Sequence, residues 1–177
     1  MDIDHSFIKH WKETGDKETD DVHRFVCYFI IFNYLYEAHC YQNHDNCGRY
    51  KRNGYKCESC SERTRIRKML KDCRTILGEN FINALNLSGD SELIIKEVQE
   101  VRNGELIDNK YDNTIDIENI GDFQEIDKLF MNIYQVRCNL FHGQKSMMME
   151  RDKGLVRESA DVLQHFLNVY INQMQKK

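Results

Sequence analysis

The sequence contains no proline, only nine glycines among 177 residues, and a single tryptophan. All-β folds need many turns, which usually rely on proline and glycine, so this scarcity disfavours a sandwich or a barrel. A long apolar run is also missing. The longest, Phe25 to Tyr36, has twelve residues interrupted by Asn33, whereas a membrane helix needs roughly 20. Because the first residues mix charged and isolated apolar side chains, we expect neither a signal peptide nor a membrane anchor.

The composition is that of a globular protein. Apolar residues make up 41% of the chain and charged residues 31%, and the length suits a single domain covering residues 1–177. Seven cysteines occur without a secretory signal. We therefore expect a reducing compartment, the cytoplasm, in which thiols stay free or bind metal.

Helical periodicity runs through most of the sequence and predicts an all-α bundle of four to five main helices. Asp122 is expected to cap one of these helices, with Glu125 completing a capping box. Residues 41–61 lose the helical pattern and are predicted to form an insertion, and residues 103–121 are predicted to form a loop. The helices are expected at about 6–11, 19–39, 62–77, 81–87, 88–101, 122–141 and 150–175.

Charge is distributed unevenly, although the net charge is only −4. Residues 44–74 hold ten Lys or Arg against four Asp or Glu, whereas residues 75–127 hold three against thirteen. A concentrated positive surface attracts phosphate backbones, so the basic stretch is a candidate RNA-binding surface. The alternative is a solvated helix face paired with the acidic segment. The residues that we expect to contact RNA are Arg49, Lys51, Arg52, Lys56, Arg63 and Arg67.

The insertion at 41–61 also carries two pairs of metal-binding residues, each with a two-residue gap, and nine residues lie between the pairs. Tetrahedral zinc takes four such ligands, and the gap lets each pair chelate one ion. His39 and Cys40 are alternative ligands, and a loop with incidental free thiols is the competing interpretation. The predicted ligands of a structural zinc ion are His44, Cys47, Cys57 and Cys60.

The helix expected at 122–141 has a regular apolar stripe whose next position is Arg137. An arginine that faces a bundle core costs several kcal/mol unless it is paired or lines a cavity. The helix ends in RCNLFHG, which places His142 at a helix C terminus, where the dipole favours its protonated form. In the simplest alternative, Arg137 pairs with an acid such as Glu37 and His142 merely caps the helix.

The pattern Arg-x4-His at the end of an apolar helix, here within IYQVRCNLFHGQK, resembles the HEPN superfamily of small helical-bundle proteins. The early segment FNYLYE and the long final helix agree with it, and the resemblance covers residues 20–42, 62–101 and 122–175. It implies a HEPN-like up-down bundle and a metal-independent endoribonuclease of antiphage defence or a toxin–antitoxin system. The chain departs from the family pattern at Cys138, where many members have asparagine, and at Gln144, where a toxin subgroup has tyrosine.

The two residue types suit RNA cleavage without a metal. His142 can act as general acid or base near neutral pH, and the planar fork of Arg137 fits phosphate oxygens. Asn139 is expected to orient one of them. Attack by the ribose 2′-hydroxyl would leave 2′,3′-cyclic phosphate and 5′-hydroxyl ends, and would require no catalytic cofactor.

Positions five apart lie about 140° apart around a regular helix, so Arg137 and His142 diverge unless the last turn unwinds or a second copy completes the site. The resemblance implies the second arrangement, in which two protomers share one cleft. The expected partners are RNA, a second copy of the chain, and an antitoxin or regulatory protein, with no membrane. The competing hypothesis is a non-catalytic helical module that binds RNA or a protein.

Overall fold

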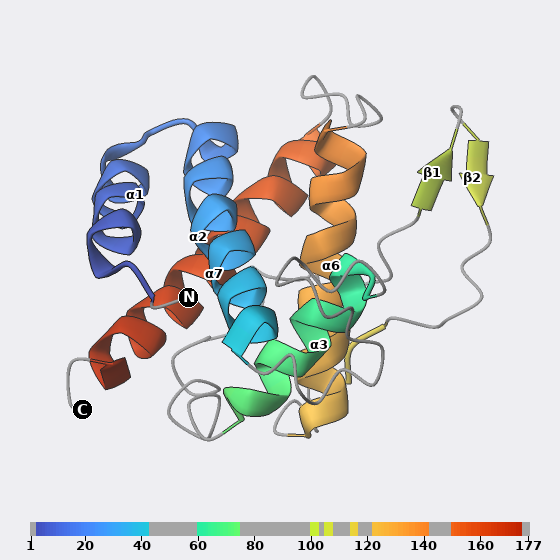
Figure 1. Cartoon of the computed structure of the whole chain (residues 1–177). Helices are drawn as coiled ribbons and strands as arrows, with labels where there is room; N and C mark the ends of the chain where they lie inside the picture. Colours follow the sequence, from blue (N-terminus) through green and yellow to red (C-terminus); the bar gives the residue numbers. More distant parts are fainter. Residues whose placement is uncertain are drawn as a thin grey trace.

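The computed structural model describes residues 3–42, 60–74, 100–102, 105–107, 114–116, 122–141 and 150–174. Within these ranges the chain is a helical bundle, as the periodicity predicts, with one short antiparallel hairpin (Figure 1). The helices are α1 (His5–Lys17), α2 (Asp21–Gln42), α3 (Glu62–Asp72), α6 (Phe123–Phe141) and α7 (Glu150–Met174), and the strands are β1 (Glu100–Arg102) and β2 (Glu105–Ile107). None of the helices in these ranges combines the length and apolarity needed to cross a bilayer.

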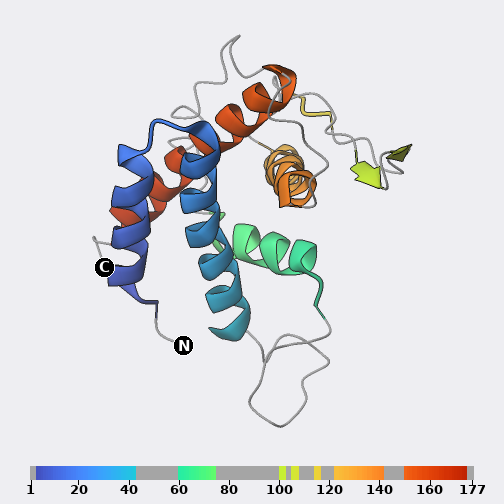
Figure 2. The same ribbon diagram turned by 90° about the horizontal axis from the view of Figure 1, so that it is seen from above.

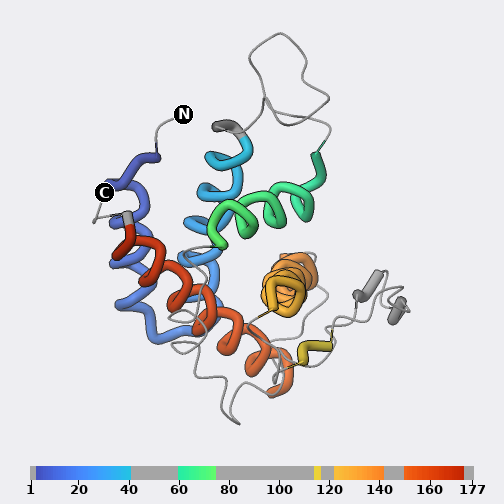
Figure 3. The backbone as a smooth tube through the Cα atoms, turned by 90° about the horizontal axis from the view of Figure 1, so that it is seen from below, coloured from blue at the N-terminus to red at the C-terminus, as the bar shows by residue number. Residues whose placement is uncertain are grey.

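Helix α2 is the centre of the bundle because its apolar residues occupy nearly every face. The buried residues of α2 do not form a single helical stripe, because Val26 and Ile30 remain partly exposed whereas Tyr28, Ile31 and Phe32 are buried. A helix that is apolar almost all round must be covered on several sides. Helix α1 runs antiparallel along one side of α2, α7 crosses it obliquely on another, and α3 lies toward α6 (Figures 2 and 3).

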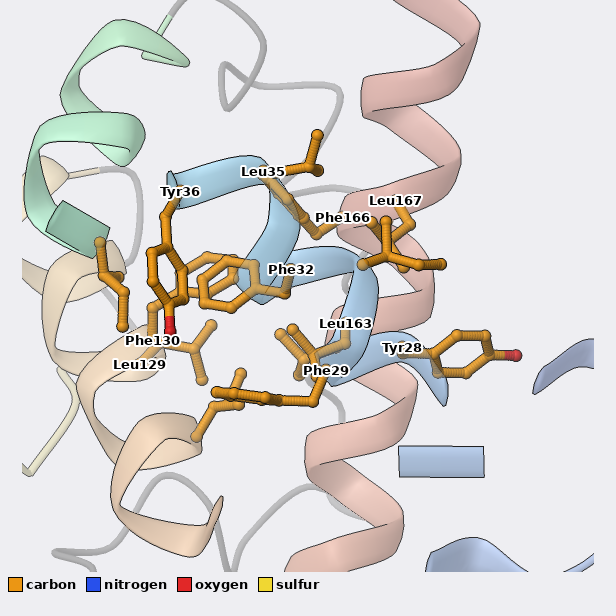
Figure 4. Close-up of a cluster of buried hydrophobic side chains, with 14 of the residues drawn as sticks. Tyr28, Phe29, Phe32, Leu35, Tyr36, Leu129, Phe130, Leu163, Phe166 and Leu167 are labelled. Carbon is orange, nitrogen blue, oxygen red and sulfur yellow. The ribbon is translucent and has the colours of Figure 1, made fainter. Parts of the chain in front are cut away.

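Three phenylalanine rings join the helices at the core. Phe32 of α2 stacks on Phe130 of α6, with ring centroids 5.3 Å apart and planes tilted by 14°. Phe166 of α7 meets both rings edge-on, at 5.7 Å and 5.3 Å (Figure 4). Such aromatic pairs each contribute about 0.5–1.5 kcal/mol beyond the apolar area that they bury. The cluster thus fixes α2, α6 and α7 relative to one another.

Helix α1 extends six residues beyond the expected end at Trp11. Its N terminus is capped by Asp4, whose side chain accepts from the backbone N–H groups of Ser6 and Phe7. The additional turns, although polar in sequence, are held by contacts that periodicity does not reveal. Asp16 accepts hydrogen bonds from Lys12 at 2.6 Å, from Tyr28 of α2 at 2.7 Å, and from Gln164 of α7 at 3.0 Å.

The ends of three other predicted elements need correction. The helix expected at 62–77 ends at Asp72, and Cys73 is its C-cap. The helix expected at 88–101 does not reach Val101, because residues 100–102 form β1, and residues 105–107 of the expected loop form β2. Asp122 does cap α6, by accepting from the Gln124 N–H. Glu125 does not complete a capping box, in which its side chain would accept from the Asp122 N–H. It is buried instead and accepts from the Asp116 N–H and from Lys128. The short helix expected at 81–87 lies outside the described residues.

Candidate functional site

The carboxylate of Glu62 is the centre of a polar cluster where α2, α3 and α6 meet. Tyr134 of α6 donates to Oε2 at 2.7 Å, and Tyr36 of α2 donates to Oε1 at 3.2 Å. Nη1 of Arg137 lies 3.8 Å from Oε2, longer than a hydrogen bond but within ion-pair range. Three side chains from two helices thus converge on one acid of a third.

Local sequence explains why Glu62 stands at this position. Ser61 caps α3, and its hydroxyl accepts from the Thr64 N–H at 3.3 Å, so Glu62 is the first residue of the helix. A carboxylate in the first turn is favoured by the positive end of the helix dipole. Glu62 lies on the same face of α3 as Ile66 and Met69, which follow it by four and seven positions and are buried in the core, so this face directs Glu62 toward α2 and α6.

Arg137 lies between an inner and an outer aromatic ring. Its guanidinium carbon is 5.7 Å from the ring centroid of Phe29, which is buried, and 5.3 Å from that of Phe141, which is exposed. The side chain keeps 28% of its surface exposed. Burial alone would lower the pKa of Arg137, but the Glu62 carboxylate and the Cys138 thiol outweigh it and the pKa is raised. A charged guanidinium is therefore presented at the surface from a fixed position.

The two tyrosines serve as donors to Glu62. Burial and the nearby carboxylate raise the pKa of both Tyr36 and Tyr134, so both phenols remain protonated at neutral pH. Tyr36 also contacts the Asn33 side chain one turn earlier in α2, and it points from α2 toward α6 (Figure 4). This arrangement orients the acid that faces Arg137.

The acid beside Arg137 is not the one that the sequence suggests. Glu37 was the expected partner in the alternative interpretation, but it pairs with Arg65 of α3. Glu62 takes its place because the N terminus of α3, rather than the end of α2, reaches Arg137. An arginine near the core thus has a partner, as the burial cost requires, and still reaches solvent.

Asn139 lies inside the bundle. It is fully buried, and its side-chain oxygen accepts from Gln135 at 2.9 Å, while Gln135 in turn accepts from Arg63 at 2.9 Å. This line of polar groups runs from the surface of α3 into α6. A contribution of Asn139 to a surface site would therefore be indirect, and Gln135 provides one route for it.

The two described members of the expected RNA-binding set have protein partners. Arg63 lies over the Tyr134 ring at 5.7 Å, and Arg67 pairs with Asp127 at 3.0 Å. Asp127 belongs to the acidic segment at residues 75–127, so this pair agrees with the alternative interpretation, in which basic and acidic segments pair with each other. Arg67 remains 56% exposed and open to a further anion. The residues Arg49, Lys51, Arg52 and Lys56 lie outside the described ranges.

A second titratable cluster lies at the opposite end of α3. His39 of α2 has Nδ1 3.8 Å from Asp72, and its Nε2 is 3.9 Å from the Cys73 sulfur and 3.3 Å from the Tyr170 hydroxyl. The order Asp–His–Cys is that of a cysteine nucleophile, but the thiol is buried and burial raises the pKa of Cys73 to about 12. Since the thiolate is the reactive form, this cluster is structural.

The remaining predicted residues are described only in part. His142, His44, Cys47 and Cys57 lie outside the described residues, whereas Cys60 directly precedes the cap of α3 and contacts Lys68 at 3.8 Å. Among the residues that are described, no group of three metal-binding side chains comes together. The zinc knuckle therefore stays a prediction.

Four residues of the site were not expected from the sequence, namely Glu62, Tyr36, Tyr134 and Phe141. Tyr36 falls in the FNYLYE segment, but no signal in the sequence separates it from the other aromatic residues of α2. Comparison with known proteins adds nothing further, because no protein-family model, no curated protein and no solved structure matches this chain.

Proposed function

We propose that the protein is a metal-independent endoribonuclease of the HEPN type, active in antiphage defence or as a toxin in the cytoplasm. The observation that supports this most directly is the setting of Arg137. It is a charged, partly exposed guanidinium near the end of an apolar helix, anchored by Glu62, five positions before His142.

Each group has a role in the proposed reaction. His142 accepts the proton of the ribose 2′-hydroxyl or donates one to the departing 5′-oxygen. Arg137 neutralises the charge that develops on the phosphorane, which is the kind of stabilisation that typically contributes two to three orders of magnitude in rate. The carboxylate of Glu62 cannot bind phosphate and instead holds the guanidinium. RNA is the substrate because DNA lacks the attacking hydroxyl.

A homodimer is part of the proposal. Because residues five apart diverge around a regular helix, one protomer would supply Arg137 and its partner would supply His142 of a shared cleft. Mixing Arg137→Ala protein with His142→Ala protein tests this directly. A shared cleft regains cleavage in mixed dimers, and two independent sites do not.

The main test uses single-stranded and structured RNA in EDTA, with wild type, Arg137→Ala, Arg137→Lys and His142→Ala. Wild type is expected to leave cyclic phosphate ends, and all three variants are expected to lose cleavage, since lysine lacks the planar fork. Arg157→Ala is the control, because Arg157 is an exposed arginine of α7 that lies outside the basic stretch. RNA binding without cleavage by wild type would replace this proposal with a non-catalytic module.

A further inference from the structure

Phe141, the last residue of α6, is the one large apolar side chain in the described ranges that is exposed to solvent, at 57% of its surface. The other large apolar side chains of α6 are buried or partly buried. Exposure of a phenylalanine ring costs about 1.5–3 kcal/mol relative to burial, and packing within this bundle does not explain its position.

The ring is also paired with a cation. Phe141 lies four positions after Arg137, on the same face of α6, and the guanidinium carbon is 5.3 Å from its ring centroid. The guanidinium lies over one face of the ring, so an anion-binding group adjoins a flat apolar surface. A nucleotide presents the complementary pair, a phosphate and the π-face of a base.

We propose that Phe141 forms a base-stacking subsite, on which an unpaired RNA base lies while Arg137 holds the adjacent phosphate. This inference rests on the proposed function and deepens it by naming how the substrate is gripped. In a duplex, stacked neighbours cover both faces of each base, so the subsite accepts only nucleotides that are unstacked, in single strands, loops or bulges.

A protein partner fits the same surface less well. Specific protein interfaces bury about 800 Å² on each side, and a single exposed ring beside a guanidinium supplies a small part of that area. Stacking on one aromatic ring, by contrast, needs only the area of one base and gains from an adjacent cation. A second copy of the chain is therefore the alternative outcome of the test.

The test measures binding of a 2′-O-methyl RNA strand, which cannot be cleaved, and of an abasic strand of the same length. Phe141→Ala and Phe141→Leu are expected to weaken binding of the first about 5- to 150-fold, the loss that removal of one base–aromatic stack causes. Binding of the abasic strand should not change. Phe141→Tyr, which keeps the ring, should bind both strands as wild type does.

A fluorescence measurement gives independent evidence. The chain has one tryptophan, Trp11, so Trp11→Phe combined with Phe141→Trp places a single reporter at the subsite. The 2′-O-methyl RNA strand should quench the tryptophan fluorescence, and the abasic strand should not. Equal quenching by both, or no quenching, would overturn the proposal.

The outcomes separate this inference from the proposed nuclease. If wild type cleaves RNA and Phe141→Ala binds and cleaves equally well, only the subsite is refuted. If wild type cuts no RNA, the nuclease is refuted whatever Phe141 does. If Phe141→Ala instead turns a dimer into a monomer in sedimentation, the ring belongs to an interface between copies and the subsite is refuted.

Discussion

Arg137 and Glu62 face each other where α6 meets the first turn of α3, with Nη1 of the arginine 3.8 Å from Oε2 of the glutamate. Two tyrosine hydroxyls also donate to the glutamate, so the position of the carboxylate does not depend on the arginine alone. The separation is longer than a hydrogen bond, which leaves the guanidinium able to turn its donors toward a phosphate.

In the proposed reaction, this relationship would make Glu62 a positioning residue. Glu62→Gln retains an acceptor for the tyrosines but removes the charge that holds Arg137. We expect kcat for RNA cleavage to fall about tenfold with KM unchanged or lowered, as for an interaction that matters in the transition state. Glu37→Gln is the matched control, since Glu37 pairs with Arg65 instead, and it should leave kcat unaltered. A rise in KM alone would show that Glu62 contributes to substrate binding and not to positioning.

Gly15 permits the close approach of α1 to α2. A Cβ at this position would lie 2.6 Å from Cε1 of Tyr28, whose hydroxyl is held by Asp16 and Gln164. Gly15→Ala should therefore destabilise the protein by about 1–3 kcal/mol through overpacking, although alanine favours a helix by about 1 kcal/mol. Urea unfolding measures the change. Lys9→Ala, an exposed substitution in the same helix, is the control, and equal or greater stability of Gly15→Ala would contradict the packing argument.

Folding stability should decrease in mild acid because of His39. Burial lowers its pKa in the folded protein, even though Asp72 opposes the shift. The unfolded chain, with an ordinary pKa near 6.5, then binds more protons, so the free energy of unfolding falls as the pH drops below about 6.5. His39→Gln should reduce this slope in urea unfolding between pH 5 and pH 8. The pKa of His165 is lowered by burial as well, so part of the slope should remain.

A zinc ion in the insertion is tested by metal analysis of the purified protein. The predicted set of His44, Cys47, Cys57 and Cys60 should hold about one equivalent per chain, because these four ligands complete a tetrahedron. Cys60→Ser should reduce that content and, since Cys60 precedes the cap of α3, should lower the thermal stability. Cys27→Ser, which alters a buried thiol of α2 outside the set, should leave the zinc content unchanged. Less than about half an equivalent in wild type would contradict the prediction.

Periodicity predicted the helices well where one side of a helix is buried. The start of α3 at Glu62, the end of α6 at Phe141 and the start of α7 at Glu150 agree with the structure. Periodicity was least informative for α2, where burial on several sides removes the contrast between faces, and for the end of α1, where side chains of α2 and α7 supply the stabilising contacts. A strand of three residues, such as β1, is too short to show the two-residue alternation that distinguishes a strand from a helix.

The candidate site could be predicted only in part. Arg137 was recognisable because a charge interrupted an apolar stripe, a feature that belongs to one helix. Glu62 and Tyr36 were not, because their importance comes from contacts between helices distant in sequence, which no local pattern encodes. Nothing in the sequence separates Phe141 from the buried aromatic residues, and its exposure in the structure distinguishes it.

The crossing of α2 by α7 affects how the protein is made. Arg24 of α2 pairs with Asp161 of α7, which is synthesised 137 residues later. The Phe32 ring likewise packs against Phe166 of α7. At a ribosomal speed of about 5–20 residues per second, the face of α2 that α7 covers is left exposed for about 7–27 seconds while the intervening chain is synthesised. Nascent chains should accordingly depend on chaperones, and the proposed ribonuclease activity would not develop until translation of the chain is nearly finished.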